Sequence, residues 1–438
     1  MKEDDRRTTP DTTMTTEPRL AARRVLIVGA GLAGLSCARE LAAHGHEPVI
    51  FEASDRVGGR VTSDIVDGFT LDRGFQVHLT AYREAAQLFD DTELDFRRFF
   101  AGARLWDGRR FVTVADPVRH PIIAFASLFR GVTTLKELRA LATIALTLQR
   151  VVDESAGTDG RTSEEWLLEQ GISPGFIDRF FRPFFGGVFL DRSLHTDSGR
   201  MRYYASCFAR GSAVVPARGM RAIPEAIASK LPAGCVHLGT AVDAVARNSV
   251  RLRDGSHAEG DAVVVATDST VACELLPGLP PLRWQSTMTA WFATPDPNFA
   301  GRALHLSSAG SGLVHHACSM SAVAPEYAPP RRGLFCANHV GGFNSISRGV
   351  TSEREIASEM RRELDGWFGA GATASWELLR LDRIARAVPR QHPGDAIPPR
   401  PIEIRGVHVA GDHCTDASIN GALRSGRLAA ARAVAACR

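Results

Sequence analysis

A glycine pattern near the N-terminus is the clearest chemical signal in the sequence. It follows the apolar run Val25–Val28 and consists of Gly29, Ala30, Gly31, Leu32, Ala33 and Gly34. At a strand-to-helix turn, the first glycine permits the tight turn and the second lets the backbone approach a pyrophosphate. The third lets the helix pack close to the strand. Because the helix N-terminus also presents N–H groups and a positive dipole to phosphates, the pattern predicts a dinucleotide-binding turn.

A second apolar run brings an acidic residue to the same ligand. A helical pattern starts at Leu32 and ends near Gly45, and Pro48–Phe51 is typical of a short buried strand that closes on Glu52. In such a strand–helix–strand unit, an acid about 20 residues after the glycines binds the ribose hydroxyls. Glu52 follows the last glycine by 18 residues. An acid at this position argues against a 2′-phosphate on the ribose.

The residues after Glu52 resemble a known family. Ala53, Arg56, Gly59 and Arg60 belong to the pattern E-A-x-x-R-x-G-G-R-x-x-[ST]. This pattern is similar to that of the flavin-containing amine oxidase and phytoene desaturase superfamily. The resemblance implies that the dinucleotide is FAD, that the Gly59–Arg60 turn lies along it, and that Arg60 contacts pyrophosphate and flavin. The planar fork of donors on an arginine suits a phosphate.

The same resemblance recurs near the C-terminus. The A-G-D segment that ends at Gly411 and Asp412, followed by Ser418–Arg427, is similar to the C-terminal flavin motif of the superfamily. There the acid accepts hydrogen bonds from the ribityl chain. The helix that follows points its N-terminus at the flavin edge where charge builds up on reduction. The resemblance gives the first role to Asp412 and the second to Ser418, Ile419 and Asn420.

Two weaker matches extend the predicted flavin site. Gly74, Phe75 and Gln76 resemble a segment that passes near the isoalloxazine, where Gln76 could contact the ring. The alternative for this segment is a plain turn and strand with a structural Asp72. Val242 falls on a segment that resembles the strand whose valine backbone clamps the adenine.

The resemblance predicts an α/β fold with a Rossmann-like FAD-binding domain and a discontinuous α+β substrate domain, as in amine oxidases and glutathione reductases. The FAD-binding domain would comprise residues 23–82, 206–269 and 384–438, and the substrate domain residues 83–205 and 270–383. Residues 1–22 are polar and are predicted to be a disordered tail, with Met14 as an alternative start. The substrate pocket would lie at the domain interface.

Periodicity predicts several local elements. Glu353–Phe368 fits an amphipathic helix with Ile356, Met360, Leu364 and Trp367 on one face. Ser163 is the expected N-cap of another helix, and the segment 236–252 fits a β-hairpin.

The residues expected of an amine oxidase are partly missing. Amine oxidases of the superfamily usually carry a lysine that assists oxygen, and the comparable stretch Ser286–Phe292 has none. Ser418 falls where a tyrosine of the amine oxidase aromatic cage would be. The segment Arg390–Gly394 has no cysteine for a covalent link, so FAD is predicted to be non-covalent. No catalytic side chain is assigned, because the flavin itself carries the hydride chemistry. These departures favour the desaturase-like branch.

Two apolar stretches have open interpretations. Residues 121–148 are helical in pattern and either line a lipid-like pocket, contact a membrane surface or face the core. A phenylalanine cluster either lines a substrate tunnel or forms a core stripe, and comprises Phe176, Phe180, Phe181, Phe184, Phe185 and Phe189. His315 and His316 match no metal pattern and are interpreted as structural; no metal is predicted.

Composition limits the partners. The 438 residues carry a formal net charge of +3 without a block of like charge, which argues against nucleic acid. No apolar run is long enough for a transmembrane helix, although peripheral membrane contact stays open. The eight cysteines lack CxxC spacing, which argues against a zinc site or a redox dithiol and favours a cytoplasmic location. The oligomeric state is not indicated.

These observations predict an FAD-dependent oxidoreductase. It would transfer a hydride from a C–H or C–N bond of an organic substrate to flavin N5, with oxygen or another acceptor reoxidising the flavin. One alternative is an isoprenoid desaturase or isomerase that uses FAD and takes a hydrophobic substrate. Another is a flavin-binding protein without turnover.

Overall fold

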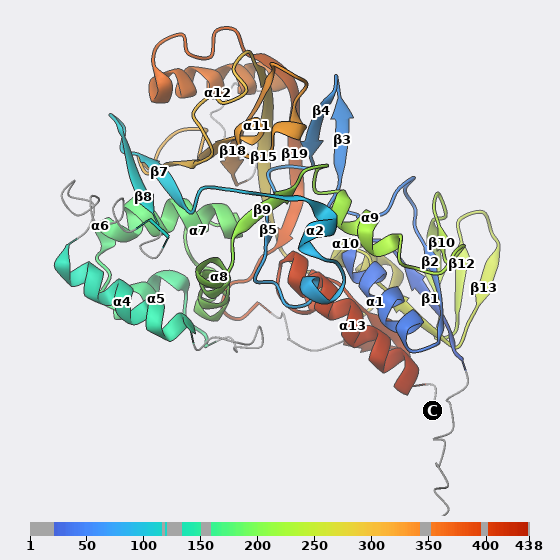
Figure 1. The fold of residues 1–438 in the computed structure, drawn as a ribbon. Helices are drawn as coiled ribbons and strands as arrows, with labels where there is room; N and C mark the ends of the chain where they lie inside the picture. The colour runs from blue at the N-terminus through green and yellow to red at the C-terminus, as the bar shows by residue number, and fades with distance from the viewer. Residues whose placement is uncertain are drawn as a thin grey trace, which may run out of the picture.

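The computed structural model describes residues 22–115, 119–120, 134–149, 159–341, 352–395 and 402–436. Its first layer is a six-stranded sheet, shown at the lower right of Figure 1. The strand order is β10 (Val236–His237), β2 (Glu47–Phe51), β1 (Arg24–Val28), β14 (Ala262–Val265), β21 (Val407–Val409) and β20 (Ile402–Ile404). All neighbours are parallel except β20 and β21. The predicted tail 1–22 lies almost wholly outside the described residues.

The central strands are apolar throughout because both faces of this sheet are covered. Val25 and Ile27 belong to the core cluster that holds α1 (Leu32–Ala43) and α13 (Ile419–Ala435). Leu26 and Val28 face the opposite cluster, which includes α10 (Ser269–Leu275) and the small sheet β11 (Val242–Val245), β12 (Ser249–Leu252) and β13 (His257–Glu259). This doubly covered parallel sheet confirms the α/β prediction.

A second, seven-stranded sheet lies above the first in Figure 1. Its order is β19 (Glu377–Pro389), β15 (Trp284–Thr294), β18 (Gly333–Val340), β17 (His316–Ser319), β16 (Leu304–Ser307), β7 (Gly102–Trp106) and β8 (Phe111–Ala115). Helix α12 (Glu353–Phe368) buries Ile356, Met360, Leu364 and Trp367 against this sheet. The predicted amphipathic face of this helix is therefore confirmed.

Short helices form a third region, at the lower left of Figure 1. They are α4 (Leu135–Gln149), α5 (Ser163–Glu169), α6 (Pro174–Phe176), a π-helical turn over Ile177–Phe181, α7 (Arg182–Phe189) and α8 (Ser198–Arg210). The predicted cap of α5 was wrong by one residue. Thr162, not Ser163, is the N-cap, and it forms a reciprocal capping box with Glu165. Part of the predicted helical stretch, residues 121–133, lies outside the described residues.

Small elements join the two sheets. They are the hairpin β3 (Ser63–Val66) and β4 (Phe69–Asp72), the sheet of β5 (His78–Leu79), β9 (Ala213–Pro216) and β6 (Phe96–Arg98), and the helices α2 (Asp91–Leu94), α9 (Ala222–Ala228) and α11 (Met320–Val323). The predicted 236–252 hairpin was wrong at its first half. Val236–His237 pairs with β2 in the large sheet, and the hairpin is formed by β11 and β12 instead.

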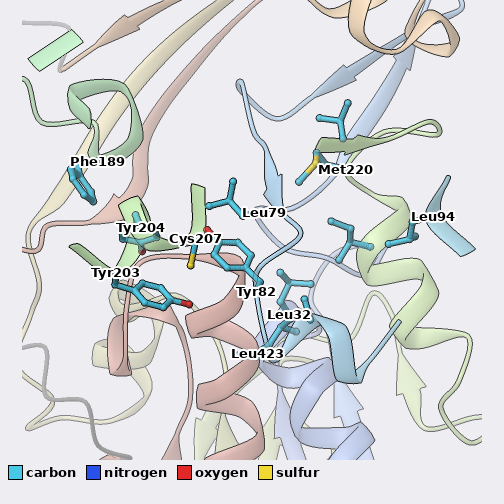
Figure 2. Packing of buried hydrophobic residues seen from close by; sticks show 14 of the residues in the cluster. Leu32, Leu79, Tyr82, Leu94, Phe189, Tyr203, Tyr204, Cys207, Met220 and Leu423 are labelled. Atoms are coloured by element: carbon cyan, nitrogen blue, oxygen red, sulfur yellow. The ribbon is translucent and has the colours of Figure 1, made fainter. Parts of the chain in front are cut away.

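One hydrophobic cluster extends from the helices of the first sheet through these small elements. Figure 2 shows part of the largest cluster, in which Leu32 of α1 and Leu423 of α13 belong to the same core as Leu79 and Tyr204. The six-stranded sheet takes its strands from three separated parts of the chain, 24–51, 236–265 and 402–409. The domain limits themselves stay a prediction.

Candidate functional site

A cavity of about 1730 Å³ runs from the glycine turn to the aromatic helices. Sequence-predicted site residues from widely separated segments meet in its wall. They are Gly29, Gly31, Leu32, Ala33, Glu52, Ala53, Gly59, Arg60, Gly74, Phe75, Gln76, Val242, Gly411, Asp412, Ser418 and Ile419.

Three of the predicted residues lie behind the wall and do not line it. The Ala30 N–H donates to Glu52 Oε2 at 2.7 Å, and thereby fixes the acid at the end of β2. A Cβ on Gly34 would lie 1.9 Å from the Gly29 carbonyl oxygen, so this glycine serves the close packing of α1. Asn420 is buried, where its Oδ1 accepts the Glu84 N–H and its Nδ2 donates to the Tyr203 hydroxyl.

Gly31 provides a test of whether a dinucleotide fits this turn. Its φ of −70° and ψ of 177° are open to any residue, so backbone conformation does not require glycine there. A Cβ on Gly31 would have no protein atom within 4 Å, and the residue lines the cavity. No side chain caps the N-terminus of α1, which begins at the next residue. The turn thus offers open space beside the backbone of Gly31 and the positive end of the α1 dipole, as a pyrophosphate requires.

A partly buried ion pair joins the two flavin motifs that the sequence predicts. Arg60 Nη2 lies 2.6 Å from Asp412 Oδ1, and Arg60 Nη1 donates to the Ala387 carbonyl at 3.0 Å. The guanidinium also lies over the Trp284 ring, 5.3 Å from its centroid. Burial works against the charge of Arg60, but the adjacent carboxylate outweighs it and raises the arginine pKa. Gln76 Nε2 holds this turn by donating to the Arg60 carbonyl.

The N-terminus of α13 faces the cavity through Ser418 and Ile419. Ser418 is the N-cap, and its hydroxyl accepts the Gly421 N–H at 2.9 Å. Sequence reasoning missed Asp416, whose buried carboxylate accepts hydrogen bonds from the hydroxyls of Ser418 and Tyr204. A Cβ on Gly421 would lie 2.5 Å from Asp416 Oδ1, so the glycine of the motif leaves room for this acid. Burial raises the Asp416 pKa.

In the 72–76 segment, Asp72 has the structural role expected of it, whereas the flavin contact of Gln76 stays a prediction. Asp72 is fully buried and accepts hydrogen bonds from Ser63 Oγ at 2.6 Å and from the Tyr327 hydroxyl at 3.0 Å, which makes it structural. Its pKa is raised by burial to about 6. Gln76 and its neighbours line the cavity. Asp382, a residue that the sequence did not single out, accepts the Gly74 N–H at 3.3 Å and the Trp291 indole N–H at 2.8 Å.

The far branch of the cavity is apolar and aromatic. The rings of Phe180 and Phe184 stack at 5.8 Å, and Phe208 meets Phe184 edge-on at 5.1 Å. Within the phenylalanine cluster, all but Phe189 line the cavity, and several are also buried core residues as the core interpretation expects. The substrate-tunnel interpretation stays a prediction. The described part of the 121–148 stretch lines the cavity through Leu141, Ile144, Ala145 and Leu148 of α4.

Strand β15 borders the cavity and holds the stretch that corresponds to the oxygen-assisting lysine of amine oxidases. Its one cavity residue is Thr287, and neither described lysine, Lys136 or Lys230, belongs to the wall. Cys414 lies behind the wall, and burial raises its pKa to about 12. Within the described ranges, no cluster of three or more His, Cys, Asp or Glu side chains suits a metal ion. No described helix combines the length and apolar character needed to cross a bilayer.

Sequence comparison assigns the family. The model of the flavin containing amine oxidoreductase family matches residues 32–434. A chloroplastic/chromoplastic 15-cis-phytoene desaturase from an Oncidium hybrid cultivar is 27% identical over 467 aligned positions, covering 93% of this chain and 77% of the relative. The corresponding Solanum lycopersicum protein is 26% identical, covering 93% of this chain and 76% of the relative.

Solved structures share the fold. An oxidoreductase from Methanosarcina mazei superposes with a TM-score of 0.73 at 16% identity, covering 92% of this chain and 98% of its own. Putrescine oxidase bound to putrescine gives a TM-score of 0.67 at 18% identity, covering 94% and 99%. At such identities the likeness concerns the fold alone. The family match spans most of the sequence, and the chain therefore belongs to the flavin containing amine oxidoreductase family as an FAD-dependent oxidoreductase.

Proposed function

We propose that this protein is an FAD-dependent dehydrogenase that introduces carbon–carbon double bonds into a long apolar substrate of the isoprenoid class. The observation that carries the proposal is the aromatic branch of the cavity, which is continuous with the dinucleotide end. Bound FAD would accept the hydride. Oxygen or another acceptor would then reoxidise it.

The chain's own residues would hold the cofactor as follows. The Gly31 turn and the α1 N-terminus would receive the pyrophosphate, and Glu52 the adenosine ribose. Arg60 would bind the pyrophosphate and flavin, and Asp412 the ribityl chain. The N-terminal turn of α13 would support negative charge on the flavin ring. No cysteine belongs to the described cavity wall, which supports non-covalent binding.

The wall of the far branch favours an uncharged substrate. Helices α4, α7 and α8 contribute no charged side chain to it, and Arg119, which lines the cavity beside α8, donates to the Gly211 carbonyl at 2.7 Å. An ammonium group taken from water into this branch would lose its hydration without gaining a carboxylate partner, which is costly. A hydrocarbon chain would instead gain about 25 cal/mol for each Å² of apolar surface buried. The relatives named as phytoene desaturases agree with this class of substrate.

Oxidation of a small amine is the second candidate, because structural neighbours include putrescine oxidase. The absence of lysine on β15 and the serine at position 418 count against it. To decide, the FAD-loaded protein would be mixed without oxygen either with liposomes containing 15-cis-phytoene or with putrescine. We expect phytoene to bleach the flavin absorbance and to form a product with a longer conjugated system. Bleaching by putrescine alone would support amine oxidation, and bleaching by neither would favour binding without turnover.

Replacements of Phe184 test the branch itself. The substitution F184Q puts a polar amide where a half-buried ring lines the cavity, whereas F184L keeps a similar volume without polarity. We expect F184Q to lower kcat/KM for phytoene by roughly tenfold or more, since an unpaired amide in an apolar site costs about 1–3 kcal/mol. F184L should stay within about threefold of the wild type. Equal losses in both variants, or a fall in FAD content, would contradict the assignment of this branch to the substrate.

A further inference from the structure

The cavity wall contains one histidine among its described residues, His316. The sequence pattern assigned it a structural role. It begins β17, near the middle of the seven-stranded sheet, and only 5% of its surface is exposed. Its position combines burial with direct contact to the cavity.

The neighbours of His316 place it where the two parts of the cavity meet. Its ring lies 5.4 Å from the ring of Phe75, which belongs to the loop next to Arg60 and Gln76. Gly187 of α7, in the aromatic branch, also adjoins the ring, since a Cβ added there would lie 3.4 Å from His316 Nδ1. A substrate reaching from the aromatic branch toward the Phe75 loop would therefore pass the imidazole.

The imidazole of His316 is neutral at pH 7, and its buried Nδ1 makes no hydrogen bond to the protein. Burial lowers the His316 pKa to about 4, and the positive charge of Arg192 and the ring of His339 add to the effect. His315, the adjacent residue, is half-buried, and its Nδ1 accepts the Val340 N–H at 2.8 Å. In either neutral tautomer, one ring nitrogen of His316 is a proton acceptor.

Other polar groups in this part of the wall are poor bases. The Tyr204 hydroxyl donates to Asp416, and burial raises its pKa well above the usual value. Asn338 carries an amide, and its Oδ1 accepts the Thr289 hydroxyl. The Asp382 carboxylate is held by Trp291, Gly74 and Arg380.

We propose that His316 is a catalytic base that accepts the proton leaving the substrate during dehydrogenation. This inference rests on the proposed function. One C–H bond of the substrate breaks with its electron pair, and the hydride goes to the oxidant, FAD. The neighbouring C–H bond then breaks, its electron pair becomes the new π bond, and its proton binds His316, which later releases it to water. Loss of hydride next to a double bond leaves an allylic cation, whose adjacent C–H is acidic enough for a weak base.

A matched histidine provides the control. His305, on the neighbouring strand β16, is fully buried and has no hydrogen-bond partner on either ring nitrogen. Its ring packs against Phe111 and Phe368 and does not line the cavity. The two residues share burial and sheet, and differ in access to the cavity.

The first test is the single-turnover formation of the desaturated product from 15-cis-phytoene in liposomes, followed by the absorbance of its longer conjugated system, because the proton leaves after the hydride. We expect H316N to slow it by roughly 10²–10⁴-fold, the usual contribution of a general base, with FAD affinity unchanged. H305N should remain within about twofold of the wild type. Free imidazole should accelerate H316A and not H305A. A wild-type rate in H316N would overturn the role of His316 while leaving the proposed function intact. A wild type that phytoene does not reduce would overturn the proposed function and this step with it.

The second test does not depend on turnover. The measurement is NMR of FAD-loaded protein labelled with ¹⁵N-histidine. The signal of His316 is assigned as the one that is missing from the spectrum of H316N. We expect a neutral imidazole at pH 7 and line broadening by the small apolar nitroxide TEMPO, with the His305 signal unaffected. A His316 signal that is protonated at pH 7, or that TEMPO leaves sharp, would overturn the proposal.

Discussion

At the scale of single residues, the Arg60–Asp412 pair is the contact that links the two ends of the chain at the cofactor site. It joins the turn after β2 to the segment before α13, across more than 350 positions. Asp412 is buried and Arg60 half-buried, so loss of the arginine would leave the buried carboxylate without its charged partner, which is costly. The same two side chains are the ones assigned to pyrophosphate and ribityl contacts.

Substitutions of the two acids test this assignment. We expect D412N and E52A each to raise the Kd for FAD by roughly tenfold to a hundredfold, since charged hydrogen bonds contribute about 1.5–3 kcal/mol. Titration of the apoprotein with FAD, followed by protein fluorescence, measures this. E259Q, which changes an exposed acid on β13, should bind FAD as the wild type does. Full affinity in both D412N and E52A would show that the site is assigned wrongly.

Where a motif fixes the backbone, sequence alone could bring residues to the cavity, although their contacts with FAD stay a prediction. Gly29, Glu52 and Gly411 come from local patterns, and all three line the cavity. His316 and Asp382 could not be found in this way, because the contacts that define their roles come from segments far away in the sequence. His315 and His316, just before and at the start of β17, carry no local sign of which ring faces the cavity.

At the scale of elements, the packing of α1 on α13 depends on small residues at their crossing. A Cβ on Gly426 would lie 2.0 Å from the Ala33 carbonyl oxygen, so the two helices can approach only if this position is glycine. Ala33 itself lines the cavity, which couples this packing to the shape of the cofactor site.

We therefore expect G426A to lower the free energy of unfolding by about 3 kcal/mol or more, as overpacking against backbone does. G366A, inside the exposed face of α12 with no atom within 4 Å of an added Cβ, should raise it by roughly 0.5–1 kcal/mol. Urea unfolding measures both. Stabilisation by G426A would contradict the packing described for α1 and α13.

The elements that were predicted correctly from sequence are those with a long periodic pattern. The sixteen residues of α12 keep one apolar face, and the helix was predicted with correct limits. The 236–252 hairpin failed because Val236–His237 is a two-residue strand, too short for its own sequence to determine its partner. It pairs with β2, more than 180 residues earlier.

At the scale of the whole molecule, one cavity connects a dinucleotide turn on the parallel sheet with an aromatic branch among helices. Strand β19 reaches from the second sheet toward the first and supplies Asp382, Arg383 and Ile384 to the wall. We propose that the FAD-binding domain comprises 23–82, 206–269 and 384–438 and that the remaining segments hold the substrate. The architecture was predictable from the motifs, whereas the shape of the cavity depends on side-chain packing that no motif records.

The visible absorption spectrum of the purified protein, recorded before and after acid precipitation, tests the central claim most directly. The account predicts two flavin bands in the native protein and their transfer, as FAD, to the supernatant after precipitation. A colourless protein that added FAD cannot reconstitute would contradict the cofactor assignment. A flavin that remained with the precipitate would contradict non-covalent binding.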